Sequence, residues 1–157
     1  MDAQSEKTLA QIIRRGRTAV LGTLRDEAPL VSMVTYVTAE DFSLFYIFVS
    51  RLAQHTVDMQ KDKRIGLLIA EADDGREDPQ TLARVSIRGS AEQIPNGIPG
   101  YTPLKNRYLK RFPESEPLFK LEDFSFWSIK PKGGRFVANL ANAYNISVET
   151  LQKVSER

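Results

Sequence analysis

The densest group of hydrogen-bond donors lies between two apolar segments, in the stretch FVSRLAQHTVDMQKDKRIGLLIA (residues 48–70). It contains Ser50, Arg51, His55 and Thr56, and His55 is the only histidine of the chain. A helix that begins after Ser50 would point unpaired backbone N–H groups, and the positive end of its dipole, towards an anion. Arg51 would add a permanent positive charge. The spacing therefore favours a phosphate-binding site at this junction of strand and helix.

The same residues also fit an ordinary helix start. Ser50 is a typical N-cap residue for the helix that we expect over residues 51–62. Arg51 and His55 would then simply be hydrated at the surface. Because helix starts with such residues are common, the pattern alone leaves both interpretations open.

Two further segments contain residues that often contact ligands. Trp127 lies in the aromatic strand sequence FSFWSI, where core packing is the default and stacking on a ligand ring is the alternative. Residues 104–112, LKNRYLKRF, are basic with interleaved aromatics, as in some nucleic-acid-binding proteins. An amphipathic helix that buries Leu104, Tyr108 and either Leu109 or Phe112 fits the same pattern, and we favour it.

No residue set fits a metal site or a known catalytic motif. One histidine and no cysteine leave too few ligands for a usual catalytic zinc site. The acidic residues between positions 73 and 78 do not have the spacing of a calcium loop, so we expect a solvated loop. The sequence contains no G-x-S-x-G, P-loop or G-x-G-x-x-G motif. Any chemistry is therefore expected to come from a bound cofactor.

Length and charge indicate an ordinary globular domain. The 157 residues predict a single domain over residues 1–157. The formal net charge of +2 gives no electrostatic reason to expect nucleic acid or a membrane as partner. The N-terminal segment has no apolar signal core and the chain has no cysteine, so we expect a cytoplasmic protein.

The hydrophobic pattern predicts seven strands and four short helices. Residues 17–50 read as a three-stranded antiparallel meander, and Gly89 indicates a bulge or a close backbone approach in a later long strand. Because the strands follow one another in hairpins, the pattern favours an antiparallel split β-barrel with helices packed outside. The predicted strands cover residues 17–25, 30–38, 44–50, 64–71, 82–94, 123–131 and 134–140. The predicted helices cover residues 5–16, 51–62, 104–112 and 148–156.

The order of these elements and their sequences resembles a known family. The segments LGTL, APLVSMVTYV, LFYIFVSRLAQHTVDMQKDKRIGLLI and DPQTLARVSIRGSAE are similar to the pyridoxamine 5′-phosphate oxidase-like FMN-binding split-barrel superfamily. The likeness is strongest to the branch that includes haem-utilisation proteins. It covers residues 17–92 well and residues 123–151 more loosely.

The resemblance implies a homodimer with two FMN sites at the subunit interface. It places the flavin ring along one strand, the phosphate at the end of the third strand and the following helix, and further contacts on the later strands. We also expect Trp127 and residues 31–36 near the interface. The implied FMN-binding residues are Ser32, Met33, Val34, Thr35, Ser50, Arg51, His55, Thr56, Arg84, Trp127 and Asn142.

The sequence departs from the family at its C-terminal end. The Arg-x-His substrate motif of true oxidases is replaced by GGRFVANL, which has no histidine, and Asn142 stands where haem-degrading relatives carry arginine. We therefore expect an FMN-dependent oxidoreductase of unknown small-molecule substrate and not a pyridoxamine phosphate oxidase. The alternatives are a non-catalytic dimer that binds flavin or haem, or a family member without cofactor. Because His55 is the only histidine, we expect no stoichiometric haem binding.

Overall fold

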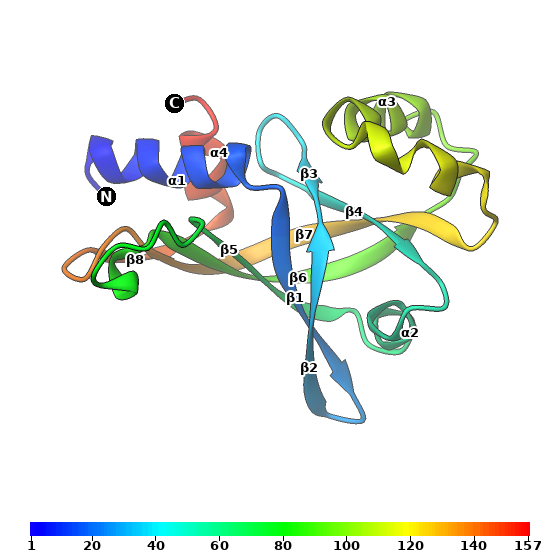
Figure 1. The fold of residues 1–157 in the computed structure, drawn as a ribbon, viewed down its shortest axis with the longest axis horizontal. Helices are drawn as coiled ribbons and strands as arrows, with labels where there is room; N and C mark the ends of the chain where they lie inside the picture. Colours follow the sequence, from blue (N-terminus) through cyan, green and yellow to red (C-terminus); the bar gives the residue numbers. More distant parts are fainter.

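The computed structural model describes residues 1–157 and is built on one antiparallel sheet of eight strands. Seven strands follow the order β2-β1-β5-β6-β7-β4-β3, and β8 pairs with β7. Only Tyr36 separates β2 from β3, which stand at the two ends of that order, so the sheet curls back on itself (Figure 1). This is the predicted split barrel. The strands are β1 (Thr18–Arg25), β2 (Ala28–Thr35), β3 (Val37–Thr38), β4 (Phe45–Ser50), β5 (Arg64–Ala70), β6 (Arg84–Ile94), β7 (Phe124–Val137) and β8 (Ala143–Ile146).

The helices cover different parts of the curled sheet. Helices α1 (Ala3–Arg15) and α4 (Val148–Val154) lie together at one end, near both chain termini (Figure 1). Helix α3 (Tyr101–Arg111) and the 3₁₀ segment η2 (Pro113–Lys120) cover the other end. A short 3₁₀ turn, η1 (Pro79–Thr81), precedes β6, and α2 (Gln54–Lys61) packs against β1 and β2. None of these helices has the length and apolar character needed to cross a membrane.

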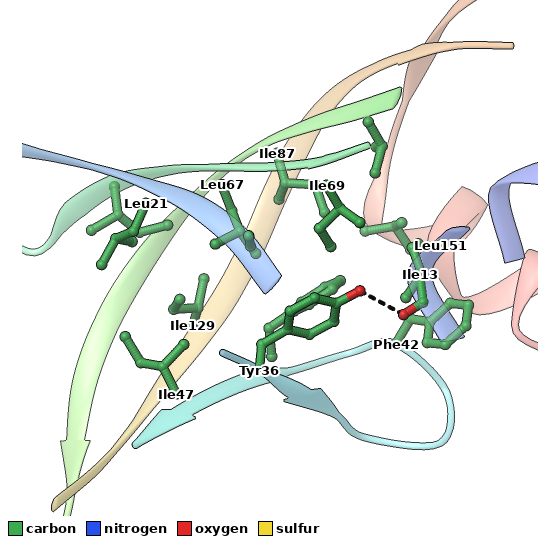
Figure 2. Close-up of a cluster of buried hydrophobic side chains, with 14 of the residues drawn as sticks. Ile13, Leu21, Tyr36, Phe42, Ile47, Leu67, Ile69, Ile87, Ile129 and Leu151 are labelled. Atoms are coloured by element: carbon green, nitrogen blue, oxygen red, sulfur yellow. Dashed lines mark hydrogen bonds between the residues drawn. The ribbon is translucent and has the colours of Figure 1, made fainter. Parts of the chain in front are cut away.

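The main core fills the inside of the barrel. Alternate residues of the strands point inward, and Figure 2 shows Leu21, Ile47, Leu67 and Ile129 converging there. The hydroxyl of Tyr36 donates a 2.7 Å hydrogen bond to the carbonyl oxygen of Ile13 at the end of α1. Burial raises the pKa of Tyr36, so this donor keeps its proton. The bond ties the junction of β2 and β3 to α1.

A second, aromatic cluster lies outside the barrel. Phe48 of β4 and Phe126 of β7 have ring centroids 4.8 Å apart on the sheet face that α3 and η2 cover. Helix α3 contributes Leu104 and Tyr108, and Phe112 follows at its C-cap; all three are less than a tenth exposed. The amphipathic interpretation of residues 104–112 is therefore confirmed, because the aromatic side chains are packed and not presented at the surface.

The bulge predicted at Gly89 is present. The register of β6 and β7 shifts between Arg88 and Gly89. A Cβ atom on Gly89 would lie 2.7 Å from the carbonyl oxygen of Lys130, closer than any side chain tolerates. Glycine is needed here because two backbones approach closely.

Four expectations about the strands were wrong. The strands predicted over residues 123–131 and 134–140 are one strand, β7, which ends at Val137 and continues through Gly133, where φ is 133°, instead of turning back. The strand predicted over residues 30–38 is divided at Tyr36 into β2 and β3. The short strand β8 was missed, and with it the sheet has eight strands. The expected meander is incomplete, because β4 pairs with β7 along its whole length and meets the first hairpin only through β3.

Candidate functional site

Helix α2 begins later than predicted. It starts at Gln54, and its N-cap residue is Ala53, which has no side chain that can cap the helix. Ser50 is therefore not the N-cap. Its hydroxyl instead accepts a 3.1 Å hydrogen bond from the N–H of Leu52 in the turn between β4 and α2. The start of α2 is left without a side-chain cap.

The uncapped helix start carries free donors. The N–H groups of Gln54 and His55 have no hydrogen-bond partner within the chain. The Arg51 side chain is exposed and makes no hydrogen bond or ion pair. Free N–H groups at a helix N-terminus beside an unpaired guanidinium form a typical anion-binding arrangement.

His55 is half-buried at this helix start. Burial lowers its pKa, and the carboxylate of Asp58, one turn along the helix, opposes that shift only in part. The imidazole is therefore neutral at pH 7 and contributes a hydrogen bond rather than a charge. Its Nδ1 lies 3.2 Å from the hydroxyl of Thr56, which is 1% exposed and belongs to the packed side of α2.

A carboxylate that the sequence did not reveal lies beside these donors. The Ser50 hydroxyl donates a 2.7 Å hydrogen bond to Oδ2 of Asp123, and the N–H of Arg51 donates to the backbone oxygen of Asp123, also at 2.7 Å. Asp123 immediately precedes β7, whose first residue pairs with Ser50. The pairing of β4 with β7 thus places a negative charge next to the candidate phosphate site.

Asp58 fixes the position of α2 and was also missed. Its side chain is 2% exposed and accepts hydrogen bonds from Thr23 Oγ1 and Arg25 Nε, both at 3.0 Å. Thr23 and Arg25 belong to β1, so this carboxylate joins the helix to the sheet. The local sequence around a mid-helix aspartate does not show whether its side chain forms a buried ion pair or is solvated.

The second group of candidate residues, Ser32, Met33, Val34 and Thr35, lies on β2. Val31 and Met33 point outward and are 70% and 71% exposed, whereas Val34 is buried in the core. The hydroxyl of Thr35 lies 2.8 Å from that of Tyr108 in α3. Helix α2 packs against β2, so the helix and this strand are neighbours in the fold.

Arg84 and Asn142 lie elsewhere. Ser50 pairs with Phe124 at the first residue of β7, whereas Arg84 pairs with Val137 at its last. The guanidinium of Arg84 donates to the carbonyl oxygens of Gln80 and Leu82, each at 2.9 Å. One chain alone therefore does not bring these two residues to the start of α2.

Trp127 is part of the core. It is 3% exposed, and its indole Nε1 is buried without a hydrogen-bond partner. Side chains of the same chain enclose its ring. We had expected Trp127 to lie near the dimer interface or the FMN. Core packing, the default for this residue, describes where it lies.

Two hollows flank the strand that carries the candidate ring-binding residues. One of about 520 Å³ lies on the outer face of β1 and β2, and Val20, Met33 and Leu68 line it together with the end of α1. The other, of about 350 Å³, lies where β2 continues into β3 and has no acidic residue in its lining. The residues that line this second hollow are Ile13, Arg14, Tyr36, Val37, Thr38, Arg107, Lys110 and Arg111.

The arginine and lysine side chains that line this second hollow have few acidic neighbours, so most of their positive charge is uncompensated. Arg107 donates to the carbonyl oxygen of Thr38 at 2.6 Å and lies 3.4 Å from the exposed carboxylate of Glu40. Arg14 donates to the carbonyl oxygen of Ser155 and to a main-chain oxygen of Arg157, the last residue of the structure. Arg111 donates to the carbonyl oxygen of Gly16, and Lys110 has no partner within the chain. The lining of this hollow is therefore positively charged. No group of three or more potential metal ligands occurs in the structure.

Solved structures share this fold. A haem-binding protein from Mycobacterium smegmatis has a TM-score of 0.84 at 21% identity, over 98% of this chain and 62% of that protein. HutZ, the haem storage protein from Vibrio cholerae, has a TM-score of 0.74 at 16% identity, over 83% and 92% of the two chains. An FAD-binding protein from Mesorhizobium loti has a TM-score of 0.63 at 16% identity, over 83% and 90%.

The sequence comparisons identify the family. No curated protein matches the sequence. A family model described as pyridoxamine 5′-phosphate oxidase matches residues 5–138, which include the whole sheet except its last strand. The chain therefore belongs to the pyridoxamine 5′-phosphate oxidase family.

Proposed function

We propose that residues 1–157 form a single FMN-binding domain and that the protein is a homodimeric flavoprotein with oxidoreductase activity. The observation that carries the proposal is the uncapped start of α2, where two free N–H groups lie beside the unpaired guanidinium of Arg51. These groups are the donors that a phosphate needs, and β2 provides an extended backbone nearby for a flat ring. The resemblance to the FMN-binding superfamily supports flavin as the source of that phosphate.

The proposed roles follow from the geometry. Arg51 neutralises the phosphate charge, while the backbone of α2 and the side chain of His55 donate hydrogen bonds to it. Residues 32–35 orient the ring, and the hollow of about 520 Å³ beside Met33 is within the usual range for ligand pockets. A bound flavin supplies hydride and electron transfer. The protein contributes position, charge and exclusion of water.

Mass spectrometry of the small molecule that copurifies with the protein tests this proposal. FMN released on denaturation is the expected result. The haem-binding proteins among the structural neighbours make haem the second candidate. Only His55 could provide an imidazole ligand to the iron, and the flavin proposal already uses it. Stoichiometric haem in place of flavin would refute the proposal, as would a saturable Soret shift that His55→Ala abolishes.

A two-fold dimer explains the exposed outer face of β1 and β2. Val31 and Met33 have few neighbours within the chain and, with Val20, form an apolar strip. Exposure of such a strip to water is unfavourable. We propose that Arg84 and Asn142 act in the site of the second subunit, since one chain alone does not bring them to its own α2 site. We infer that both subunits use the same surface, as two-fold symmetry requires.

Light scattering should therefore give twice the 17.7 kDa mass of one chain. The Met33→Glu variant should shift the protein to monomers, because the interface would bury an unpaired carboxylate. The Ile98→Glu variant places the same charge on an exposed apolar residue of a loop and should remain dimeric. A monomeric wild type, or equal behaviour of the two variants, would contradict the proposed interface.

We further infer that the substrate is anionic. The positively charged hollow begins where β2 ends, so a substrate on a ring along β2 would extend towards Arg107 and Lys110. Guanidinium groups bind phosphate and carboxylate through paired hydrogen bonds. A negatively charged end group fits this lining, and an apolar one does not.

Inorganic phosphate should stabilise the FMN-saturated protein, in which the proposed α2 phosphate site is already filled, at constant ionic strength. At about ten times its Kd, phosphate adds about 1.4 kcal/mol to the free energy of unfolding. Lys110→Glu should abolish most of this effect, because it reverses a charge that has no other partner. Lys7→Glu, which makes the same change on the exposed face of α1, should keep it. Equal phosphate stabilisation of both variants in thermal melts would contradict the assignment.

A further inference from the structure

We propose that Asp123 is a specificity-determining residue of the α2 site, which weakens binding of a phosphate dianion and leaves the flavin free to exchange with solution. The inference rests on the proposed function. Its starting point is the 2.7 Å hydrogen bond from Ser50 Oγ to Asp123 Oδ2. This carboxylate lies among the groups that would bind the phosphate.

The Ser50 hydroxyl has one hydrogen, so it can donate to only one acceptor at a time. Its oxygen already accepts from the N–H of Leu52, and its hydrogen goes to Asp123. A phosphate must therefore displace Asp123 from Ser50 or bind without this donor. In the first case the Asp123 carboxylate loses its hydrogen bond, and in the second the phosphate has one donor fewer than the sequence indicates.

Electrostatic repulsion adds to this competition. A phosphate oxygen that takes the Ser50 hydrogen would lie about 2.7 Å from Oγ, and Asp123 Oδ2 lies 2.7 Å from the same atom. With the carboxylate in its present position, the two anionic oxygens would be at most about 5.4 Å apart, since the two distances share Oγ. At this range a like charge in a partly buried site opposes binding strongly.

The backbone holds Asp123 at the site. Its carbonyl oxygen accepts from the N–H of Arg51 at 2.7 Å, at the point where β4 and β7 begin to pair. The carboxylate can rotate, but its Cα cannot leave without breaking this pairing. Arg51 therefore attracts the phosphate while Asp123, held by the same residue, repels it.

The test compares FMN with riboflavin, which has the same ring and no phosphate. Binding is measured by quenching of flavin fluorescence in wild type, Asp123→Asn and Glu122→Gln. The Asp123→Asn variant keeps an oxygen that can accept from Ser50, so the fold should be preserved, and thermal melts check this. Glu122→Gln removes the same charge from the exposed neighbouring residue.

We expect Asp123→Asn to increase the affinity for FMN by about tenfold or more, because one like charge at ~5 Å is removed. Its affinity for riboflavin should stay within twofold, and Glu122→Gln should change neither. Unchanged or weaker FMN binding in Asp123→Asn would overturn the inference, as would an equal gain for both flavins. A wild type that binds neither flavin would instead overturn the proposed function, so the two fail in different ways.

Discussion

Replacing both Arg51 and His55 with alanine should weaken FMN binding by about 30- to 1,000-fold. The guanidinium would make a charge-assisted hydrogen bond of about 1.5–3 kcal/mol, and the neutral imidazole one of about 0.5–1.5 kcal/mol. Together they account for about 2–4 kcal/mol of binding free energy. The fold should survive, because Arg51 is exposed and makes no side-chain contact that holds the sheet together.

A flavin titration followed by fluorescence measures this effect. The matched control replaces Gln60 and Lys61, two exposed residues at the opposite end of the same helix, with alanine. Their loss should leave the affinity within twofold, since they lie a helix length from the proposed phosphate. If the Arg51 and His55 variant binds FMN as tightly as the control, the phosphate does not bind at the start of α2.

Removing the carboxylate of Asp58 should have the largest effect on stability. The Asp58→Ala variant leaves the buried hydroxyl of Thr23 without its partner and breaks the ion pair with Arg25. We expect a loss of about 2–4 kcal/mol, since an unsatisfied buried group and a lost charged hydrogen bond each cost about 1–3 kcal/mol. Thermal unfolding should shift down by roughly 4–16 °C, at about 2–4 °C per kcal/mol for a chain of this size.

The control for this variant is Asp62→Ala. Asp62 caps the other end of α2 and pairs with Arg64, whose side chain is 63% exposed. Ion pairs of this kind contribute about 0–1 kcal/mol, so its melting temperature should fall only slightly. Equal losses in the two variants would mean that Asp58 does not anchor the helix. If it does, Asp58→Ala should also weaken flavin binding, because the α2 donors lose their fixed position.

Local sequence patterns predicted most of the barrel. Alternation identified the strands from residue 17 to residue 94, and the bulge at Gly89 followed from a glycine inside an apolar strand. The same reasoning read Gly133 as a turn between two strands. In fact β6 pairs with β7 both before and after Gly133, and β8 pairs with it from Gly134 on. Whether a glycine bends or ends a strand depends on partners far away in the sequence.

The candidate site was harder to predict for a similar reason. Ser50 has the local character of an N-cap, but its hydroxyl pairs with Asp123, which lies 73 positions along the chain. For Trp127, core packing was the default and ligand contact the alternative, and only the inward face of β7 decides between them. Local patterns therefore located the donors around α2, while long-range strand pairing decided which of them remain free.

The central role of β7 has a consequence for synthesis on the ribosome. This strand pairs with β4, β6 and β8, and it is made after both β4 and β6. Until residues 124–137 emerge, one edge of β4 and one edge of β6 have no partner, and the apolar inner face cannot be closed. The sheet of the nascent chain therefore keeps these unpaired edges until β7 has been synthesised. Codons that slow elongation before β7 should lengthen the time during which chaperones must protect these edges.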